Sequence, residues 1–161
     1  MKYALLLLAI FGAADNLVAS IPLPLNPIRR LLCHVRGGDY LHPGDAQAID
    51  TVLARAVEYN PEVLKNPVLD VGCGYGSTIN YLATRGLQNL VGIDSDASAI
   101  AYAQKTYPSF TFLAGDATDP AAYGPRHSFG LVCLFSVIYA IKDKETLLKT
   151  LATVAQPGAI L

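Results

Sequence analysis

The chain is poor in charge, and its few charged residues form no cluster. Lysine, arginine, aspartate and glutamate make up 16% of the 161 residues, and the net charge is −1. No basic run is longer than Arg29-Arg30, whereas binding to a nucleic-acid backbone needs many clustered basic side chains. We therefore expect no nucleic acid among its partners. A hydrophobic content of 52% excludes a disordered chain and supports a sizeable core.

Cysteine is also scarce. The three cysteines, Cys33, Cys73 and Cys133, lie far apart, with neither a C-x-x-C pair nor a Cys/His ligand spacing. This spacing indicates neither a zinc site nor a disulfide framework. Cys73 and Cys133 fall in apolar surroundings, so we predict small, buried and inert thiols.

The chain has an apolar N-terminal segment, residues 1–25, but no long hydrophobic run. Lys2 precedes an apolar stretch over residues 3–14, which is shorter than the roughly twenty residues needed to span a bilayer. Together with the small residues at 17–20, this N-terminal segment resembles a secretory signal peptide. Two alternatives stay open, a cleaved signal and a peripheral or core helix. If the segment contacts a membrane, the basic residues between 29 and 36 keep the following domain in the cytoplasm.

One segment carries the strongest functional signal, because an apolar strand leads directly into glycines at alternate positions. Residues 68–71 read Val-Leu-Asp-Val, typical of a buried parallel strand, and Gly72, Gly74 and Gly76 follow. Glycine lets the backbone turn tightly and approach a bound molecule. A helix then begins at Ser77, and its free N–H groups suit a carboxylate or a phosphate. The segment predicts a nucleotide-like ligand.

Two aspartates define the class of that ligand. Asp94 ends a second apolar strand, residues 89–93, where a carboxylate can accept hydrogen bonds from both ribose hydroxyls. Asp70 precedes the first glycine by two positions, where it would repel a pyrophosphate and attract a cationic amino group. The spacing G-x-G-x-G also differs from the dinucleotide fingerprint G-x-G-x-x-G. Both features disfavour a nicotinamide dinucleotide.

The run V-L-D-V-G-C-G-Y-G at residues 68–76 resembles the first motif of the class I S-adenosylmethionine-dependent methyltransferases. Further matches follow in the family's order at residues 91–96, 112–117, 129–136 and 156–159. The resemblance covers roughly residues 64 to 161. It implies an α/β fold with a doubly wound, mostly parallel, Rossmann-like sheet, and S-adenosyl-L-methionine as cofactor. It also implies methyl transfer to an acceptor that the sequence does not identify, and the lack of a basic patch favours a small molecule.

The resemblance assigns roles to individual residues. Asp116 would accept a hydrogen bond from the adenine amine, and Ser136 would enter the reaction cleft after the fourth strand. The cofactor-binding residues expected are Asp70, Gly72, Gly74, Gly76, Asp94, Ser95, Asp116, Ala117 and Ser136. If the acceptor must lose a proton, His42 and Tyr139 are the candidate catalytic bases, because both are expected near the cleft and no motif marks a base.

The remaining pattern predicts alternating strands and helices after an irregular, proline-rich stretch. Residues 26–63 form a cap or lid region, including a helix from Asp45 to Asn60, and residues 64–161 form the cofactor-binding domain. Further helices are expected over 77–85, 97–106 and after Asp143, and further strands over 110–113 and 129–135.

Only residues 159–161 remain for a fifth strand, so the sheet is expected to lack its last strands. The edge of the fourth strand and the apolar face of the last helix would then be uncovered, which favours self-association through the open edge. Alternatives to a methyltransferase are a cofactor-binding subunit or pseudoenzyme and, less favoured, an NAD(P)-dependent oxidoreductase. A cytoplasmic location is expected from the cofactor; export is the alternative if the N-terminal segment is a signal.

Overall fold

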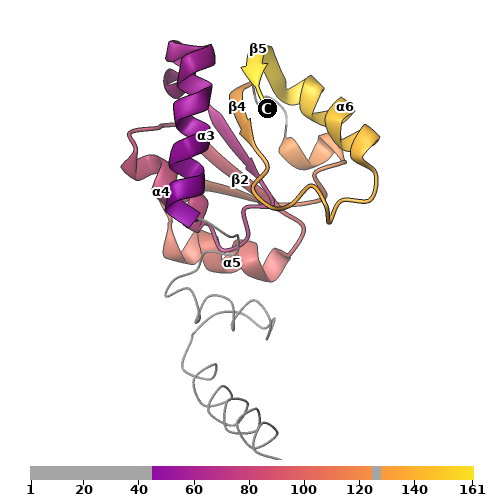
Figure 1. Ribbon diagram of the computed structural model, residues 1–161. Helices are drawn as coiled ribbons and strands as arrows, with labels where there is room; N and C mark the ends of the chain where they lie inside the picture. The colour runs from indigo at the N-terminus through magenta and orange to yellow at the C-terminus, as the bar shows by residue number, and fades with distance from the viewer. Residues whose placement is uncertain (1–44, 125–127) are drawn as a thin grey trace, which may run out of the picture. The chain divides into compact units, whose positions relative to one another are not determined.

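The computed structural model describes residues 45–124 and 128–161, which lie in one compact unit beginning at residue 42. A five-stranded parallel sheet in the order β3-β2-β1-β4-β5 has helices on both faces (Figure 1). The strands are β1 (Val68–Val71), β2 (Leu90–Asp94), β3 (Thr111–Ala114), β4 (Phe129–Cys133) and β5 (Ala155–Ile160). The helices are α3 (Asp45–Tyr59), α4 (Ser77–Thr84), α5 (Ala97–Thr106) and α6 (Lys144–Val154), with 3-10 helices η1 (Pro61–Lys65) and η2 (Pro120–Tyr123). The predicted fold class is confirmed.

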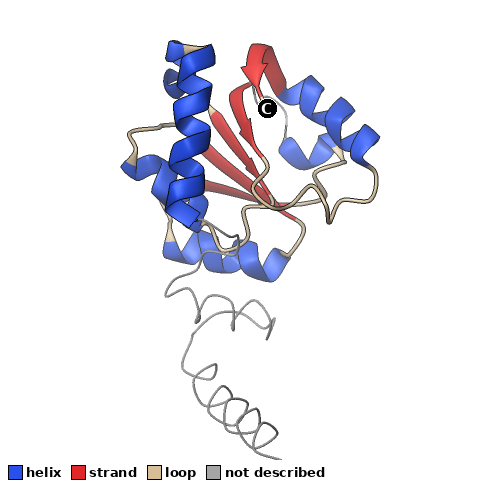
Figure 2. Ribbon diagram, viewed as in Figure 1, coloured by secondary structure: helices blue, strands red, loops and turns tan. Residues whose placement is uncertain are grey.

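The sheet separates α3, α4 and α5 from α6 and η2 (Figure 2). Every residue of β1, β2 and β4 is buried, as expected for central parallel strands covered on both faces. Side chains from these strands pack with η2 and α6 in one core, made up of Leu69, Val71, Val91, Ile93, Tyr123, Phe129, Val132, Leu147, Leu151 and Val154. Parallel pairing of β1 with β2 and with β4 brings the carboxyl ends of these three strands to the same edge of the sheet.

Aspartate caps explain where two helices begin. The Asp96 carboxylate accepts hydrogen bonds from the backbone N–H groups of Ser98 and Ala99, and α5 has the predicted bounds. The Asp143 carboxylate accepts from the N–H of Thr146, so the predicted start of α6 is also confirmed. The two 3-10 helices were not predicted, although each starts at a proline that follows a capping Asn or Asp.

The end of the sheet differs from the prediction. The fifth strand begins at Ala155 and pairs with β4, through Phe129 to Ala155 and Leu131 to Ile160, with an irregular register between them. Gly158 adopts a φ of +81° within this stretch, which few other residues tolerate. The edge of β4 is therefore covered, and the apolar face of α6 is buried on the sheet. The expectation that both were uncovered was wrong.

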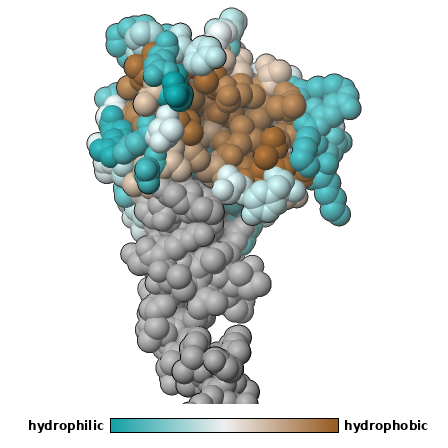
Figure 3. All heavy atoms as spheres, viewed as in Figure 1, coloured by the Kyte–Doolittle hydropathy of each residue, from teal (hydrophilic) through white to brown (hydrophobic). Residues whose placement is uncertain are grey.

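The described sheet has two edge strands, β3 and β5. Figure 3 shows hydrophobic residues gathered on the side of the molecule between α3 and α6, where β5 also ends (Figure 1). Among the described helices, none is long and apolar enough to cross a membrane. The predictions for the N-terminal segment, the lid before α3, Cys33 and His42 concern residues outside those that the structure describes.

Candidate cofactor site

The glycine loop folds over the end of β2. Because β1 and β2 are parallel and in register, both end at the same edge of the sheet. The N–H groups of Gly72 and Cys73 both donate to the carbonyl oxygen of Ile93, at 2.7 and 3.1 Å. The backbone thus turns sharply at the end of β1 and stays close to Asp94, the last residue of β2.

The loop adopts the backbone conformation that its glycines permit. Gly72, Gly74 and Gly76 have φ angles of +76°, +52° and +89°, all in the left-handed region. A Cβ on Gly72 would lie 2.4 Å from the Val137 side chain, and one on Gly76 would lie 2.8 Å from the Phe112 ring. The predicted tight turn is confirmed, and two of the glycines are also needed for packing within the protein.

Asp94 holds the site together. One of its carboxylate oxygens accepts from the N–H of Gly74 and the other from the N–H of Asp96, both at 2.9 Å. Its carbonyl oxygen accepts from the N–H of Gly115 at 3.0 Å. Asp94 is only 8% exposed. One buried residue therefore links the glycine loop, the start of α5 and the loop after β3, while its contact with a ribose stays a prediction.

Asp70 is a buried carboxyl with an unsatisfied oxygen. It is 2% exposed, and its Oδ2 has no hydrogen-bond partner among the described residues. Burial raises the pKa of Asp70 to about 8, and the nearby Asp94 carboxylate adds to the shift. Cys133 lies opposite Asp70 on β4, and burial raises the pKa of its thiol. A buried acceptor of this kind suits a ligand that brings a cationic donor.

Asp116 lies in the loop after β3 and is exposed. Its Oδ1 accepts from the N–H and the hydroxyl of Thr118, both at 2.8 Å, and these bonds lower the pKa of Asp116. Two side chains that were not predicted as site residues support the loop after β3. The Tyr123 hydroxyl donates to the carbonyl oxygen of Ala117, and the Thr150 hydroxyl donates to the carbonyl oxygen of Thr118. No sequence motif marks either supporting residue.

The other predicted residues lie at different levels of exposure. Ser95 and Ser136 are exposed, and Ser136 has a φ of +53°, which is unusual for a serine. Its neighbour Val137 packs over Gly72, so the segment after β4 contacts the glycine loop. Tyr139 is 77% exposed. His42, the other candidate base, is outside the described residues.

An aromatic pair fixes the glycine loop on α5 and was not part of the predicted site. Tyr75, buried within the loop, meets Tyr102 of α5 edge to face, with ring centroids 5.2 Å apart. Cys73 is buried as predicted, and a Cβ on Gly92 would lie 2.7 Å from its Sγ. In the described part of the chain, no three His, Cys, Asp or Glu side chains are placed to hold a metal ion.

Comparison with known proteins connects this site to one family. The model of a methyltransferase domain family matches residues 68–158, from β1 into β5. Norajmaline N-methyltransferase of Rauvolfia serpentina is 31% identical over 146 residues, covering 76% of this chain and 49% of that protein. Ajmaline N-methyltransferase of the same plant is 32% identical over 108 residues, covering 63% of this chain and 36% of that protein.

Solved structures agree in fold. Streptomyces venezuelae DesVI superposes with a TM-score of 0.61 at 24% identity, over 71% of this chain and 48% of that one. The sugar N-methyltransferase KedS8 from Streptoalloteichus superposes with a TM-score of 0.59 at 22% identity. The match covers 78% of this chain and 49% of that one. The chain belongs to the methyltransferase domain family. It spans less than half the length of the plant relatives that it matches.

Proposed function

We propose that this chain binds S-adenosylmethionine and takes part in transfer of its methyl group to a small-molecule acceptor. The observation that carries the proposal is the unpartnered Oδ2 of Asp70, buried beside a left-handed glycine loop. The cationic amino group of the cofactor is a suitable partner for that oxygen. Structures in the same fold group are described in complex with S-adenosylhomocysteine or sinefungin, which supports the same ligand class.

The described residues divide the binding work among them. When bound, the cofactor supplies a methyl group activated by its sulfonium. Asp70 would hold the amino group, Asp94 the ribose, and Asp116 the adenine amine, each at the carboxyl edge of the sheet where ligands of open α/β sheets bind. Gly72 and Gly76 keep the loop compact, and the buried Gly74 donates its N–H to the Asp94 carboxylate, so the loop stays against the residue that would hold the ribose. Catalysis would then consist mainly of positioning the acceptor.

The acceptor class we propose is an amine of a small molecule. Support comes from the relatives, which are described as N-methyltransferases of ajmaline, norajmaline and phosphoethanolamine. The net charge of −1 and the absence of a basic cluster also favour a small molecule over nucleic acid. Tyr139 and His42 remain the candidate bases if the amine must lose a proton.

Calorimetry with S-adenosylmethionine and S-adenosylhomocysteine tests the proposal directly. Saturable binding of both, and no response to NAD or NADP, would support it; a response to the dinucleotides alone would overturn it. A methylation assay with radiolabelled cofactor and a panel of small amines then separates an enzyme from a cofactor-binding subunit. No observation favours the oxidoreductase alternative.

Two further properties belong to this proposal. We expect the chain in the cytoplasm, where the cofactor is made, and fractionation of cells carrying a C-terminally tagged chain checks this. We also propose that two copies associate beside β5, where hydrophobic residues gather on the surface and the outer strand edge has no partner among the described residues.

A further inference from the structure

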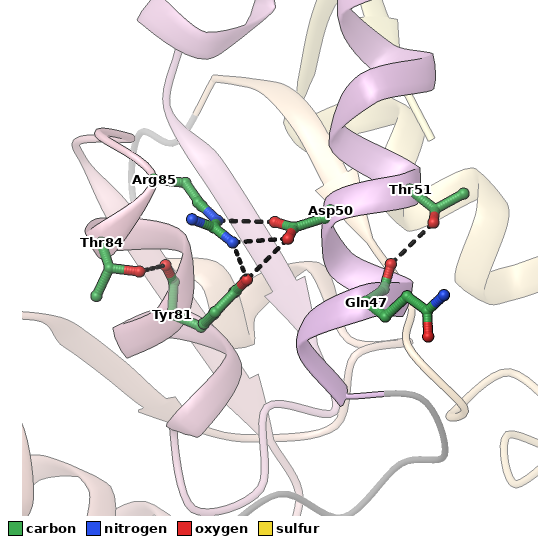
Figure 4. A network of polar contacts seen from close by, with 6 residues as sticks. All are labelled: Gln47, Asp50, Thr51, Tyr81, Thr84 and Arg85. Carbon is green, nitrogen blue, oxygen red and sulfur yellow. Dashed lines mark hydrogen bonds and ion pairs between the residues drawn. The ribbon is translucent and has the colours of Figure 1, made fainter.

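A cluster of three polar side chains joins α3 to α4 away from the cofactor site. The Arg85 guanidinium donates to both oxygens of Asp50, from Nε at 2.7 Å and from Nη2 at 2.6 Å. The Tyr81 hydroxyl donates to Asp50 Oδ2 at 2.9 Å, and Arg85 also contacts that hydroxyl. Figure 4 shows Asp50 pointing from α3 across to Arg85 and Tyr81.

The geometry of this cluster distinguishes it from ordinary surface ion pairs. Arg85 forms a two-pronged contact with the carboxylate and also lies over the Tyr81 ring, 4.7 Å from its centroid. The Arg85 side chain is 46% exposed and that of Asp50 44%. By contrast, Arg55–Glu58, Lys65–Glu62 and Lys149–Glu145 each link residues three or four positions apart, and their side chains are at least 62% exposed. Pairs of that kind contribute little.

The cluster connects α3 to α4, the helix that follows the glycine loop. Tyr81 lies one helical turn after Ser77, the first residue of α4, which directly follows the glycine loop. Asp50 lies five residues after the start of α3, and α3 packs against α4. The buried residues of α3 form a narrow stripe, Ile49, Leu53 and Ala56. The two-pronged contact from Arg85 to Asp50 adds a polar attachment between α3 and α4 beside this apolar one.

We propose that Asp50, Arg85 and Tyr81 are positioning residues that fix the start of α3 relative to the glycine loop and thereby support cofactor binding. The inference rests on the proposed cofactor, and the residues themselves do not contact it. The Arg85 hydrogen bonds lower the pKa of Asp50, so the carboxylate stays charged at neutral pH.

The test uses the full 161-residue chain and S-adenosylhomocysteine as the probe. Asp50→Asn removes the charge with little change of shape, and Arg85→Lys keeps the charge but removes the fork. Each is expected to raise the Kd about threefold to tenfold. Glu58→Gln is the matched control, because it makes the same change on α3 in an ion pair that does not reach α4; its Kd should stay within about twofold of wild type.

Two additional measurements separate positioning from general stability. Combining Asp50→Arg with Arg85→Asp restores an ion pair and should recover most of the affinity lost in Asp50→Arg alone. Hydrogen exchange at the amides of residues 49–53, which lie beyond the unbonded first turn of α3, should be faster in Asp50→Asn and Arg85→Lys than in the control, without ligand. If Asp50→Asn does not fold, Arg85→Lys decides the same question.

Wild-type Kd in both single variants would overturn the inference and leave the proposed function intact. The inference is also overturned if the control Glu58→Gln binds more weakly too, and if the loss of affinity in all three variants simply follows their loss of melting temperature. If the wild-type chain does not bind the probe, the proposed function is wrong and the inference falls with it.

Discussion

At the scale of single residues, Asp94 accepts hydrogen bonds from three backbone N–H groups of the protein in addition to its proposed contact with the ligand. Its carboxylate accepts from the backbone N–H groups of Gly74 in the glycine loop and Asp96 at the start of α5. We expect Asp94→Ala to weaken binding of S-adenosylmethionine and S-adenosylhomocysteine by about 2 to 4 kcal/mol, since charged acceptors contribute roughly 1.5 to 3 kcal/mol per bond. Calorimetry measures this loss, and unchanged affinity would remove Asp94 from the site. Asp143→Ala, which removes the cap of α6, is the control that should lower stability but not affinity.

Asp70 makes stability depend on pH in an unusual direction. Its folded pKa of about 8 lies above the unfolded value of 3.8, so the folded state holds a proton that the unfolded state has lost. Its contribution to stability is therefore full below pH 4 and is lost as the pH rises to about 8. We expect urea unfolding of the wild type to show this decline between pH 5 and 8, and Asp70→Asn to reduce it. An identical pH profile for the two proteins would contradict the assignment.

The same residue predicts proton release on binding. At pH 7 Asp70 is mainly neutral, and a cationic ligand group favours its charged form. Calorimetry with S-adenosylhomocysteine in buffers of different ionisation enthalpy should detect the released proton in the wild type and fewer protons in Asp70→Asn. Equal proton release would show that another group titrates.

At the scale of elements, the glycine loop offers a comparison of two left-handed glycines. We expect Gly74→Val to abolish cofactor binding with the helix content nearly unchanged, because the φ of +52° and the space of the ligand both oppose a branched side chain. Gly86→Val is the matched control: its φ is +88°, but a Cβ there meets nothing within 4 Å. The control should lose stability and keep its affinity. Normal binding by Gly74→Val, measured by calorimetry with circular dichroism in parallel, would make the loop a structural turn.

Local patterns were sufficient to predict most elements. Asp96 before α5, the alternating glycines after β1 and the apolar strands act within a few residues, so the α5 bounds and the left-handed loop could be read from the sequence. Contacts between residues far apart in the sequence could not be predicted in this way. The bond from Gly74 to Asp94 spans 20 positions and that from Arg85 to Asp50 spans 35, and nothing local marks either. The pairing of β5 was missed because Pro157 and Gly158 resemble a turn more than a strand.

At the scale of the whole molecule, the open edge of β5 is not a regular template for pairing. Pro157 has no N–H to donate, and four residues of β5 lie between its two register pairs where β4 has one. Such irregularity limits strand-to-strand association. The hydrophobic surface between α3 and α6 (Figure 3) is the stronger driving force, because burying apolar area does not need matched hydrogen bonds.

We therefore expect the chain to associate with a second copy through this surface as its concentration rises. Leu161, which follows β5 and is 57% exposed, lies at the C-terminus marked between α3 and α6 in Figure 1. Leu161→Lys should shift the association to higher concentration, since a charge opposes burial of the surrounding apolar area. Thr106→Lys, at the exposed end of α5, adds the same charge elsewhere and should behave as the wild type. Light scattering over a concentration series measures the shift. A wild-type chain that stays monomeric at every concentration would show that the surface needs no partner copy.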